Sequence, residues 1–193
     1  MNIIYDLSIP GWANEKQLKE IERLAKLVPR NGRIVEVGAY LGRSSYAWAK
    51  SCHPTVKVYC IDHWSGWTLD KKNFNESIVP PIGWTPNLAC TIELFKKYTK
   101  TCKNIVPIRA YSPYIKWENG LVDLVYIDDG HEYENTKANI DFWYKKIKKG
   151  GILCGDDYSP YWSGVIKAVD EIARELNVKS EHNVEFFWQF VKN

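Results

Sequence analysis

The sequence contains no long apolar run, and this lack limits where the protein can act. No stretch approaches the roughly 18 apolar residues that a membrane-spanning helix needs. The opening residues, MNIIYDLSIPGW, also lack the basic region followed by an apolar region that is typical of a secretory signal. The sequence therefore predicts no membrane partner and no targeting segment.

Paired cysteines are missing as well. The cysteines are odd in number and never stand in a C-x-x-C pair, which favours neither a disulfide framework nor a zinc knuckle. Unpaired thiols are typical of a reducing compartment, so a cytoplasmic location is predicted. The five residues are Cys52, Cys60, Cys90, Cys102 and Cys154.

Charge of one sign is not concentrated anywhere in the chain. The 26 Lys and Arg residues and the 23 Asp and Glu residues give a net charge of +3, without the long basic run of many nucleic-acid-binding proteins. No nucleic-acid partner is therefore predicted. A length of 193 residues suffices for one sizeable core and is short for two, so residues 1–193 are expected to form a single domain.

The chain does contain a regular alternation of short β-branched segments with helical patterns. Strands are expected at 34–37, 56–61, 105–108, 121–127, 152–154 and 184–191. Helices are expected at 14–28, 44–51, from 85 onward, 132–148 and 164–176. Such alternation implies parallel strands with right-handed crossovers and helices on both faces of the sheet. The predicted fold class is α/β, a Rossmann-like doubly wound, mostly parallel sheet with an antiparallel C-terminal strand.

Two segments stand apart from this alternation. Residues 1–30 hold an N-terminal helix in which Asn14 and Gln17 are spaced like a capping box. Residues 63–84 are rich in Trp, Gly, Pro, Asn and Ser without clear periodicity. They are longer than an ordinary connection, which is typical of a functional lid. Thr85-Pro86 then predicts the N-cap and first turn of the next helix.

The turn after the first strand carries two glycines and a nearby acid. Ligands of open doubly wound sheets bind beyond the carboxyl ends of the strands. Gly38 and Gly42 have the spacing G-x-x-x-G, not the G-x-G-x-x-G that cradles a pyrophosphate. The carboxylate of Glu36 would repel an anionic dinucleotide and attract the sulfonium and ammonium groups of S-adenosylmethionine. Taken alone, this turn also fits a purely structural role.

An acid follows the second strand. Asp62 stands about twenty residues after the glycine turn, where a carboxylate can accept hydrogen bonds from the ribose hydroxyls of an adenosine. Trp64 could lie against the adenine. The alternatives are a strand-terminating turn for Asp62 and loop packing for Trp64.

Four carboxylates follow the fourth and fifth strands. Asp128 and Asp129 end one strand, and Asp156 and Asp157 end the next. If these strands are neighbours, the carboxylates converge, and either a hard divalent cation neutralises some of them or their pKa values rise. Magnesium with Asp128, Asp156 and Asp157 as ligands would leave positions open for a substrate hydroxyl, whose proton His131 could accept. Helix capping and solvated turns are the alternatives.

With these residues in place, the chain from Ile34 to Val169 resembles class I S-adenosylmethionine-dependent methyltransferases. The likeness is to the subgroup of metal-dependent sugar O-methyltransferases and catechol O-methyltransferase-like enzymes. The motifs that carry it are VEVGAYLGRSS, YCIDHWSG, LVYIDDGHEY and KKGGILCGDDYS.

The resemblance implies a role for each matching residue. Asp128 and the pair Asp156 and Asp157 would bind Mg²⁺ or another divalent cation, and His131 and Asp128 would be catalytic. The donor would be held by Glu36, Gly38, Gly42, Ser44, Asp62, Trp64, Ser112 and Asp128. Catechol-type enzymes have a lysine where this chain has His131, which favours the sugar-modifying branch.

The expected activity is methyl transfer from S-adenosylmethionine to a hydroxyl of a small molecule or glycan. The N-terminal helix and exposed tryptophans could serve a homodimer. Two alternatives stay open. One is a ligand-binding domain that has kept the fold and lost the chemistry. The other is a nicotinamide-dependent oxidoreductase, which shares the sheet but needs the tighter phosphate-binding turn.

Overall fold

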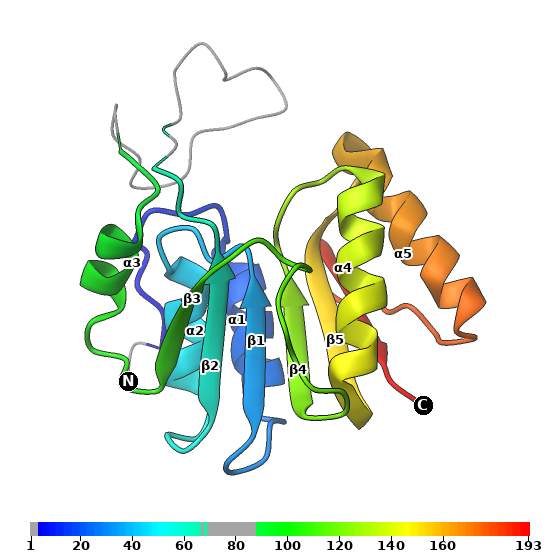
Figure 1. Cartoon of the computed structure of the whole chain (residues 1–193), viewed down its shortest axis with the longest axis horizontal. Helices are drawn as coiled ribbons and strands as arrows, with labels where there is room; N and C mark the ends of the chain where they lie inside the picture. The colour runs from blue at the N-terminus through cyan, green and yellow to red at the C-terminus, as the bar shows by residue number, and fades with distance from the viewer. Residues whose placement is uncertain (1–3, 67, 69–87) are drawn as a thin grey trace.

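The structure is a computed structural model, and it describes residues 4–66, 68 and 88–193. A six-stranded sheet runs through it in the order β3-β2-β1-β4-β5-β6, with helices on both sides (Figure 1). The strands are β1 (Arg33–Val37), β2 (Lys57–Asp62), β3 (Ile105–Arg109), β4 (Val122–Ile127), β5 (Ile147–Tyr158) and β6 (Phe186–Val191). The helices are α1 (Glu15–Ala25), α2 (Arg43–Ser51), α3 (Ile92–Thr99), α4 (Tyr133–Lys146), the short 3₁₀ helix η2 (Pro160–Trp162) and α5 (Ser163–Glu175).

Strand pairing confirms the predicted fold class. β1 pairs in parallel with β2 on one side and with β4 on the other, and β4 pairs in parallel with β5. β6 returns antiparallel to β5, with Leu153 opposite Phe190. The order of the strands reverses at β1, so the carboxyl ends of β1, β2 and β4 meet at the point where open sheets of this kind bind ligands.

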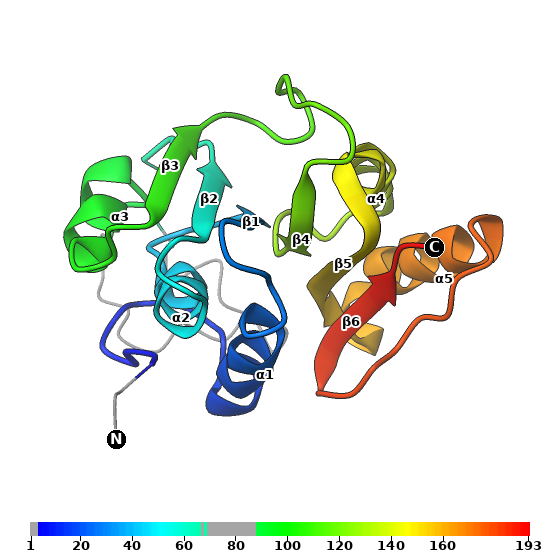
Figure 2. The same cartoon turned by 90° about the horizontal axis from the view of Figure 1, so that it is seen from below.

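Alternate residues of the central strand face two separate cores. Ile34 of β1 packs in the core formed with α1, α2 and α3, whereas Val35 packs in the core formed with α4 and α5 (Figure 2). Successive strand residues point to opposite faces, so both faces of β1 are apolar and buried. By the same alternation, Glu36 points toward the side of α1 and α2.

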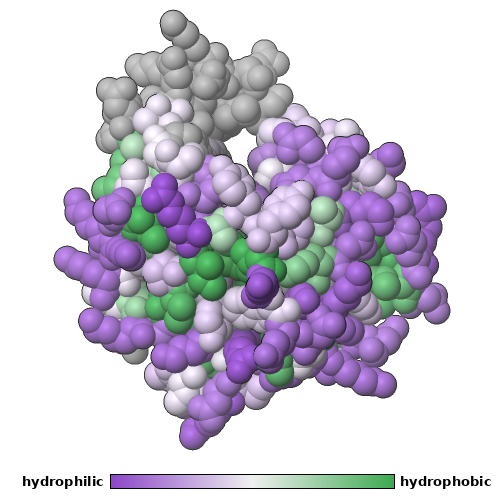
Figure 3. All heavy atoms as spheres, viewed as in Figure 1, coloured by the Kyte–Doolittle hydropathy of each residue, from purple (hydrophilic) through white to green (hydrophobic). Residues whose placement is uncertain are grey.

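A loop, not a helix, connects β3 to β4. Trp117 of this loop packs edge-on against Tyr59 of β2, with ring centroids 5.0 Å apart, and it also contacts Trp143 of α4. Figure 3 shows apolar residues gathered toward the middle of this face, between α3 and α4, inside a mostly hydrophilic rim. The aromatic side chains therefore cover part of the sheet that a crossover helix would otherwise cover.

Two element boundaries differ from the prediction by more than the others. The helix expected from Thr85-Pro86, two residues outside the described part of the chain, begins only at Ile92. Its N-cap is Thr91, whose hydroxyl accepts a hydrogen bond of 3.3 Å from the Leu94 N–H, while Ala89 pairs with Thr68 in an isolated bridge. The fifth strand begins at Ile147, well before the predicted 152, because α4 ends at Lys146 and the chain pairs at once with β4.

The N-terminal cap is as predicted. Asn14 is the N-cap of α1, and its side chain and that of Gln17 form the reciprocal capping box. Most of the predicted lid, 63–84, lies outside the described residues. None of the helices that the structure describes is both long and apolar enough to cross a membrane.

Candidate active site

Gly38 occupies the point where the ends of β1 and β4 come closest. Its φ of +87° lies in the left-handed region that glycine tolerates. A Cβ there would lie 1.8 Å from the carbonyl oxygen of Asp128, so no side chain can be accommodated. Gly42, with a φ of +95°, is the N-cap of α2 and lies against Thr99 and Phe95. Both glycines therefore let the turn pass close beneath the site.

Asp62, at the end of β2, is anchored by backbone donors. The Tyr40 N–H donates to one carboxylate oxygen at 2.9 Å, and the Trp64 N–H donates to the other at 2.8 Å. Burial raises the pKa of Asp62, although these two hydrogen bonds oppose the rise. Each oxygen keeps a lone pair for a further donor, so Asp62 is held in place and can still bind the ribose hydroxyls predicted for it.

Trp64 contributes to this site from below. Only 2% of the residue is exposed, and its ring packs against Phe95. Its indole N–H donates to the Tyr40 carbonyl at 2.7 Å, which ties β2 to the glycine turn. Trp64 is not among the residues that line the cavity described next, and stacking of its ring on adenine stays a prediction.

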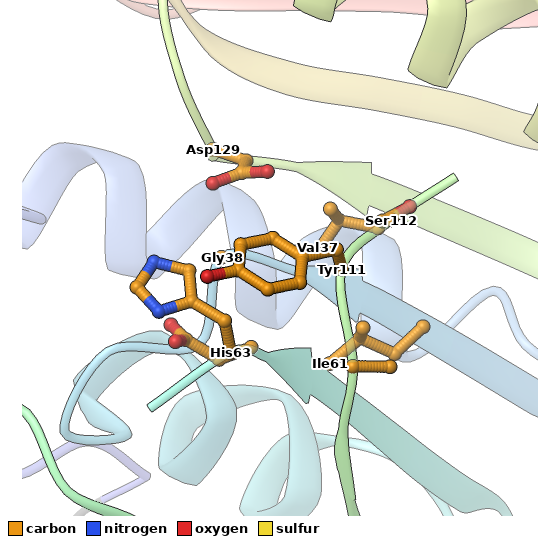
Figure 4. Close-up of a pocket in the computed structure, with 9 residues that line it drawn as sticks. Val37, Gly38, Ile61, His63, Tyr111, Ser112 and Asp129 are labelled. Carbon is orange, nitrogen blue, oxygen red and sulfur yellow. The ribbon is translucent and has the colours of Figure 1, made fainter. Parts of the chain in front are cut away.

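A small cavity opens at the carboxyl ends of β1 and β2 (Figure 4). The rings of His63 and Tyr111 are stacked across it, with centroids 5.0 Å apart and planes 17° from parallel. They leave about 10 Å³ of space, room for about one water molecule. The lining residues are Val37, Gly38, Ile61, Asp62, His63, Ala110, Tyr111, Ser112 and Asp129.

Three of the polar or aromatic lining residues had no predicted role in donor binding: His63, Tyr111 and Asp129. Each lies one or two residues after the end of a strand, since His63 follows β2, Tyr111 follows β3 and Asp129 follows β4. Position at the carboxyl end of a parallel strand is therefore the signal that could have found them.

Ser112 and Ser44 have different surroundings. Ser112 lines the cavity, but its hydroxyl donates to Asn139 Oδ1 at 2.6 Å and accepts from the Trp143 indole at 2.9 Å. Ser44 is buried at the start of α2 and hydrogen-bonds with Glu36. The predicted contacts of both serines with a donor stay predictions.

Glu36 lies beneath the glycine turn and does not line the cavity. It is fully buried, and the hydroxyl of Ser45 donates to its Oε2. Burial raises the pKa of Glu36 to about 7, against hydrogen bonds from Ser44, Ser45 and Cys60 that lower it. Its Oε1 has no hydrogen-bond partner among the described residues. Direct contact of Glu36 with a cationic donor stays a prediction.

The acids after β4 and β5 converge as predicted. The two strands are parallel neighbours, with Ile127 opposite Gly155, so Asp128 and Asp156 extend from the same sheet edge. Burial raises the pKa of Asp128, and the charges of Asp156 and Asp157 raise it further. The pKa of Asp156 is raised to about 7, first by burial and then by Asp157. Two adjacent buried carboxylates cannot both ionise without a compensating charge.

Asp128, Asp156 and Asp157 each contact a side chain that can donate a hydrogen bond. The Tyr126 hydroxyl donates to Asp128 at 3.2 Å, and Gln17 of α1 donates to Asp156 at 2.5 Å. His131 Nε2 lies 2.8 Å from Asp157 Oδ2. In the described residues, no three acidic, His or Cys side chains are arranged as a metal site.

His131 is held on two sides. Its ring stacks on Trp162 of η2, with centroids 4.0 Å apart, while Asp157 binds Nε2. Burial disfavours the charged imidazolium, but the hydrogen bond and charge of Asp157 outweigh it, so the pKa of His131 is raised. Asp157 itself has a φ of +65°. A non-glycine residue in this region indicates local strain, which is common at functional sites.

Comparison with known families fits this geometry. Residues 35–158, more than half of the chain, match the model of a family described as a methyltransferase domain. The chain belongs to this methyltransferase family. It is an S-adenosylmethionine-dependent methyltransferase of class I, as the sequence motifs indicated, and the nicotinamide-dependent alternative is thereby set aside.

Sequence similarity to a viral protein covers a short part of this methyltransferase. A segment of 57 residues is 35% identical to uncharacterized protein R132 of Acanthamoeba polyphaga mimivirus, and the match spans 28% of this chain and about a quarter (26%) of that protein.

Solved structures share the fold at low identity. The O-methyltransferase NovP is 16% identical with a TM-score of 0.66, over 92% of this chain and 80% of its own. An O-methyltransferase from Bacillus cereus, in complex with SAH, is also 16% identical with a TM-score of 0.60, over 93% and 82%. A precorrin-6y C5,15-methyltransferase from Geobacter metallireducens is 11% identical with a TM-score of 0.67, over 98% and 100%. One fold thus serves different acceptors, so the acceptor must be argued from the site.

Proposed function

We propose that this methyltransferase transfers the methyl group of S-adenosylmethionine to a hydroxyl oxygen of a small molecule or sugar, assisted by a divalent cation. The observation that carries the proposal is the placement of two sites on one sheet edge. A cavity with Asp62 lies at the ends of β1 and β2, and a His131–Asp157 pair lies with Asp128 and Asp156 at the ends of β4 and β5.

The donor half rests on Asp62 and Gly38. Asp62 is positioned by two backbone N–H groups and offers its remaining lone pairs to a diol. Gly38 has no side chain, so the turn packs directly against the Asp128 backbone at the edge of the cavity that it lines. Methyl transfer is an in-line displacement, in which the acceptor oxygen forms a bond to the methyl carbon as the carbon–sulfur bond breaks, so the main contribution of the protein is alignment.

The acceptor half rests on His131. Because Nε2 faces the Asp157 carboxylate, we assign the proton of the neutral ring to Nε2, which leaves the lone pair of Nδ1 to accept the hydroxyl proton. The imidazolium that results is stabilised by Asp157, as in other base–orienter pairs. Asp157 is therefore the orienting group and His131 the base.

The carboxylate oxygens of the acidic cluster are suitable ligands for a hard cation. Asp128, Asp156 and Asp157 supply only carboxylate oxygens, which are the ligands that Mg²⁺ prefers. Asp156 Oδ1 is buried and has no hydrogen-bond partner in the part of the chain that the structure describes. Such an oxygen, beside carboxylates that raise the pKa values of one another, would be satisfied by a cation. When bound, the metal would make the acceptor hydroxyl easier to deprotonate.

The test combines donor binding with an acceptor screen. The protein is titrated with S-adenosylhomocysteine in a calorimeter, and is then incubated with methyl-labelled S-adenosylmethionine and a panel of glycans, catechols and nucleosides. We expect donor binding, transfer to a hydroxyl, and loss of transfer on chelation. Full turnover in excess chelator would refute the metal role. Donor binding without transfer to any acceptor would favour the inactive ligand-binding domain.

A homodimer and a cytoplasmic location belong to the same proposal. Trp12 and Leu27, which flank α1, are 44% and 58% exposed. Such apolar side chains are available for a contact between copies. Light scattering coupled to size-exclusion chromatography measures the mass and tests the dimer.

A further inference from the structure

Gln17 connects the N-terminal helix to the acidic cluster. It lies in the first turn of α1, and only 4% of the residue is exposed. Its Nε2 is 2.5 Å from Oδ2 of Asp156, a residue 139 positions further along the chain. Nothing in the donor site or in the His131–Asp157 pair requires this contact.

The orientation of the Gln17 amide is determined by its two partners. Oε1 accepts a hydrogen bond of 2.8 Å from the backbone N–H of Asn14. A flipped amide would place its NH₂ group against this donor and its oxygen against the Asp156 carboxylate, and both contacts would be repulsive. The NH₂ group therefore faces Asp156, and the capping box of α1 fixes it there.

This contact makes the two carboxylate oxygens of Asp156 different from one another. Oδ2 is occupied by Gln17, while Oδ1 is buried with no partner among the described residues. The backbone carbonyl of Asp156 is held independently by the Trp188 indole at 3.1 Å. With backbone and one carboxylate oxygen fixed, Oδ1 is the oxygen of Asp156 that remains for another ligand.

We infer that Gln17 is a positioning residue: its buried amide, locked by the α1 capping box, holds Asp156 so that Oδ1 is left for the divalent cation. The inference rests on the proposed metal-assisted function and adds a residue to it. Partners that orient metal-binding carboxylates commonly contribute 10–100-fold to metal affinity. Gln17 thus connects α1 to a site formed by β4 and β5.

The experiment measures binding of Mn²⁺, as a paramagnetic probe, to the full chain saturated with S-adenosylhomocysteine. In Gln17→Leu, we expect Mn²⁺ affinity to fall by roughly 10-fold or more, with the affinity for S-adenosylhomocysteine unchanged. Electron paramagnetic resonance gives the first quantity and calorimetry the second. If Gln17→Leu does not fold, Gln17→Met, which is unbranched and of similar length, takes its place.

Asn14→Ala is the matched control. It removes the side chain that caps α1 but keeps the backbone N–H that holds Gln17, so it lowers the melting temperature without changing Mn²⁺ affinity. Wild-type Mn²⁺ affinity in Gln17→Leu would overturn the inference alone, as would an equal loss in Asn14→Ala. If the wild type binds S-adenosylhomocysteine but no Mn²⁺, the metal half of the proposed function fails and this inference fails with it.

Discussion

The imidazole of His131 and the carboxylate of Asp157 lie 2.8 Å apart and come from two neighbouring strands. His131 lies in the segment after β4, and Asp157 is the last residue but one of β5. Because Asp157 contacts the ring and Trp162 stacks on it, the imidazole that we propose as the base is held before any acceptor arrives.

The first prediction concerns this pair. His131→Gln should lower kcat by about 10²–10⁴-fold, the usual contribution of a general base, and Asp157→Asn should lower it as well. Affinity for S-adenosylhomocysteine should not change, because neither residue lines the donor cavity. Steady-state kinetics with an acceptor from the screen measure the first effect and calorimetry the second. Wild-type kcat in His131→Gln would exclude this residue as the base.

The second prediction concerns Asp62. Asp62→Ala should abolish measurable S-adenosylhomocysteine binding, since the ribose loses its acceptors and the Tyr40 and Trp64 N–H groups lose theirs. Asp62→Asn is the matched control for shape, and we expect at least a roughly 10-fold loss of affinity because one acceptor becomes a donor. Circular dichroism checks that the variants fold. Unchanged calorimetric affinity in both would exclude Asp62 as a ribose ligand.

The third prediction concerns the closed cavity. The stacked rings of His63 and Tyr111 leave about 10 Å³, far less than an adenosine needs, so donor binding requires them to move. Tyr111→Ala removes one ring and should raise the association rate of S-adenosylhomocysteine several-fold, because the open state of the cavity that admits the ligand is more populated. Tyr114 is 86% exposed on the same loop and outside the lining, so Tyr114→Ala is the control. Stopped-flow fluorescence measures the rate, and an unchanged or slower rate in Tyr111→Ala would contradict the prediction.

The fourth prediction concerns the pH dependence of stability. The pKa of Glu36 is raised by burial from 4.5 to about 7, so the folded state binds the proton more tightly than the unfolded state. The contribution of Glu36 to the free energy of unfolding is therefore fully present below pH 4.5 and is lost as the pH rises to about 7. Glu36→Gln cannot ionise and avoids this loss.

As the pH rises through that window, the free energy of unfolding of Glu36→Gln should increase relative to that of the wild type, by on the order of 3 kcal/mol at most. Urea unfolding of both proteins at a series of pH values measures the difference. Ser8→Ala, at an exposed position whose hydroxyl contacts Asp6 and not Glu36, should follow the wild type. A pH-independent difference between Glu36→Gln and wild type would show that Glu36 is not a buried titrating group.

Local pattern was sufficient for much of the fold. β-branched runs followed by glycine turns and amphipathic helices predicted the strands and helices, because these periodicities reflect which side chains must be buried. The capping box of Asn14 and Gln17 was visible for the same reason, since its partners are three residues apart. Acids placed directly after strands predicted the meeting of Asp128 with Asp156, because parallel neighbours end at one edge.

For some residues the sequence predicted the position in the fold but not the contacts of the side chain. Glu36 stands next to the glycine turn, yet strand alternation directs it into the core against Ser45. Trp64 follows Asp62 closely, yet its ring packs on Phe95 below the turn. α3 starts at Ile92, after a bridge between Ala89 and Thr68 that no local propensity records.

The sequence by itself determined the α/β class, the glycine turn and the acids at the strand ends, because each is a matter of local spacing. Only the tertiary structure decided which groups meet: Tyr111 on His63, Asp157 on His131, and Gln17 on Asp156 across 139 positions of chain. Their hydrogen bonds and stacking depend on distances of a few ångströms between segments that are remote in sequence. Those distances are set by packing of the two cores on the sheet, and the chemistry of the site is set with them.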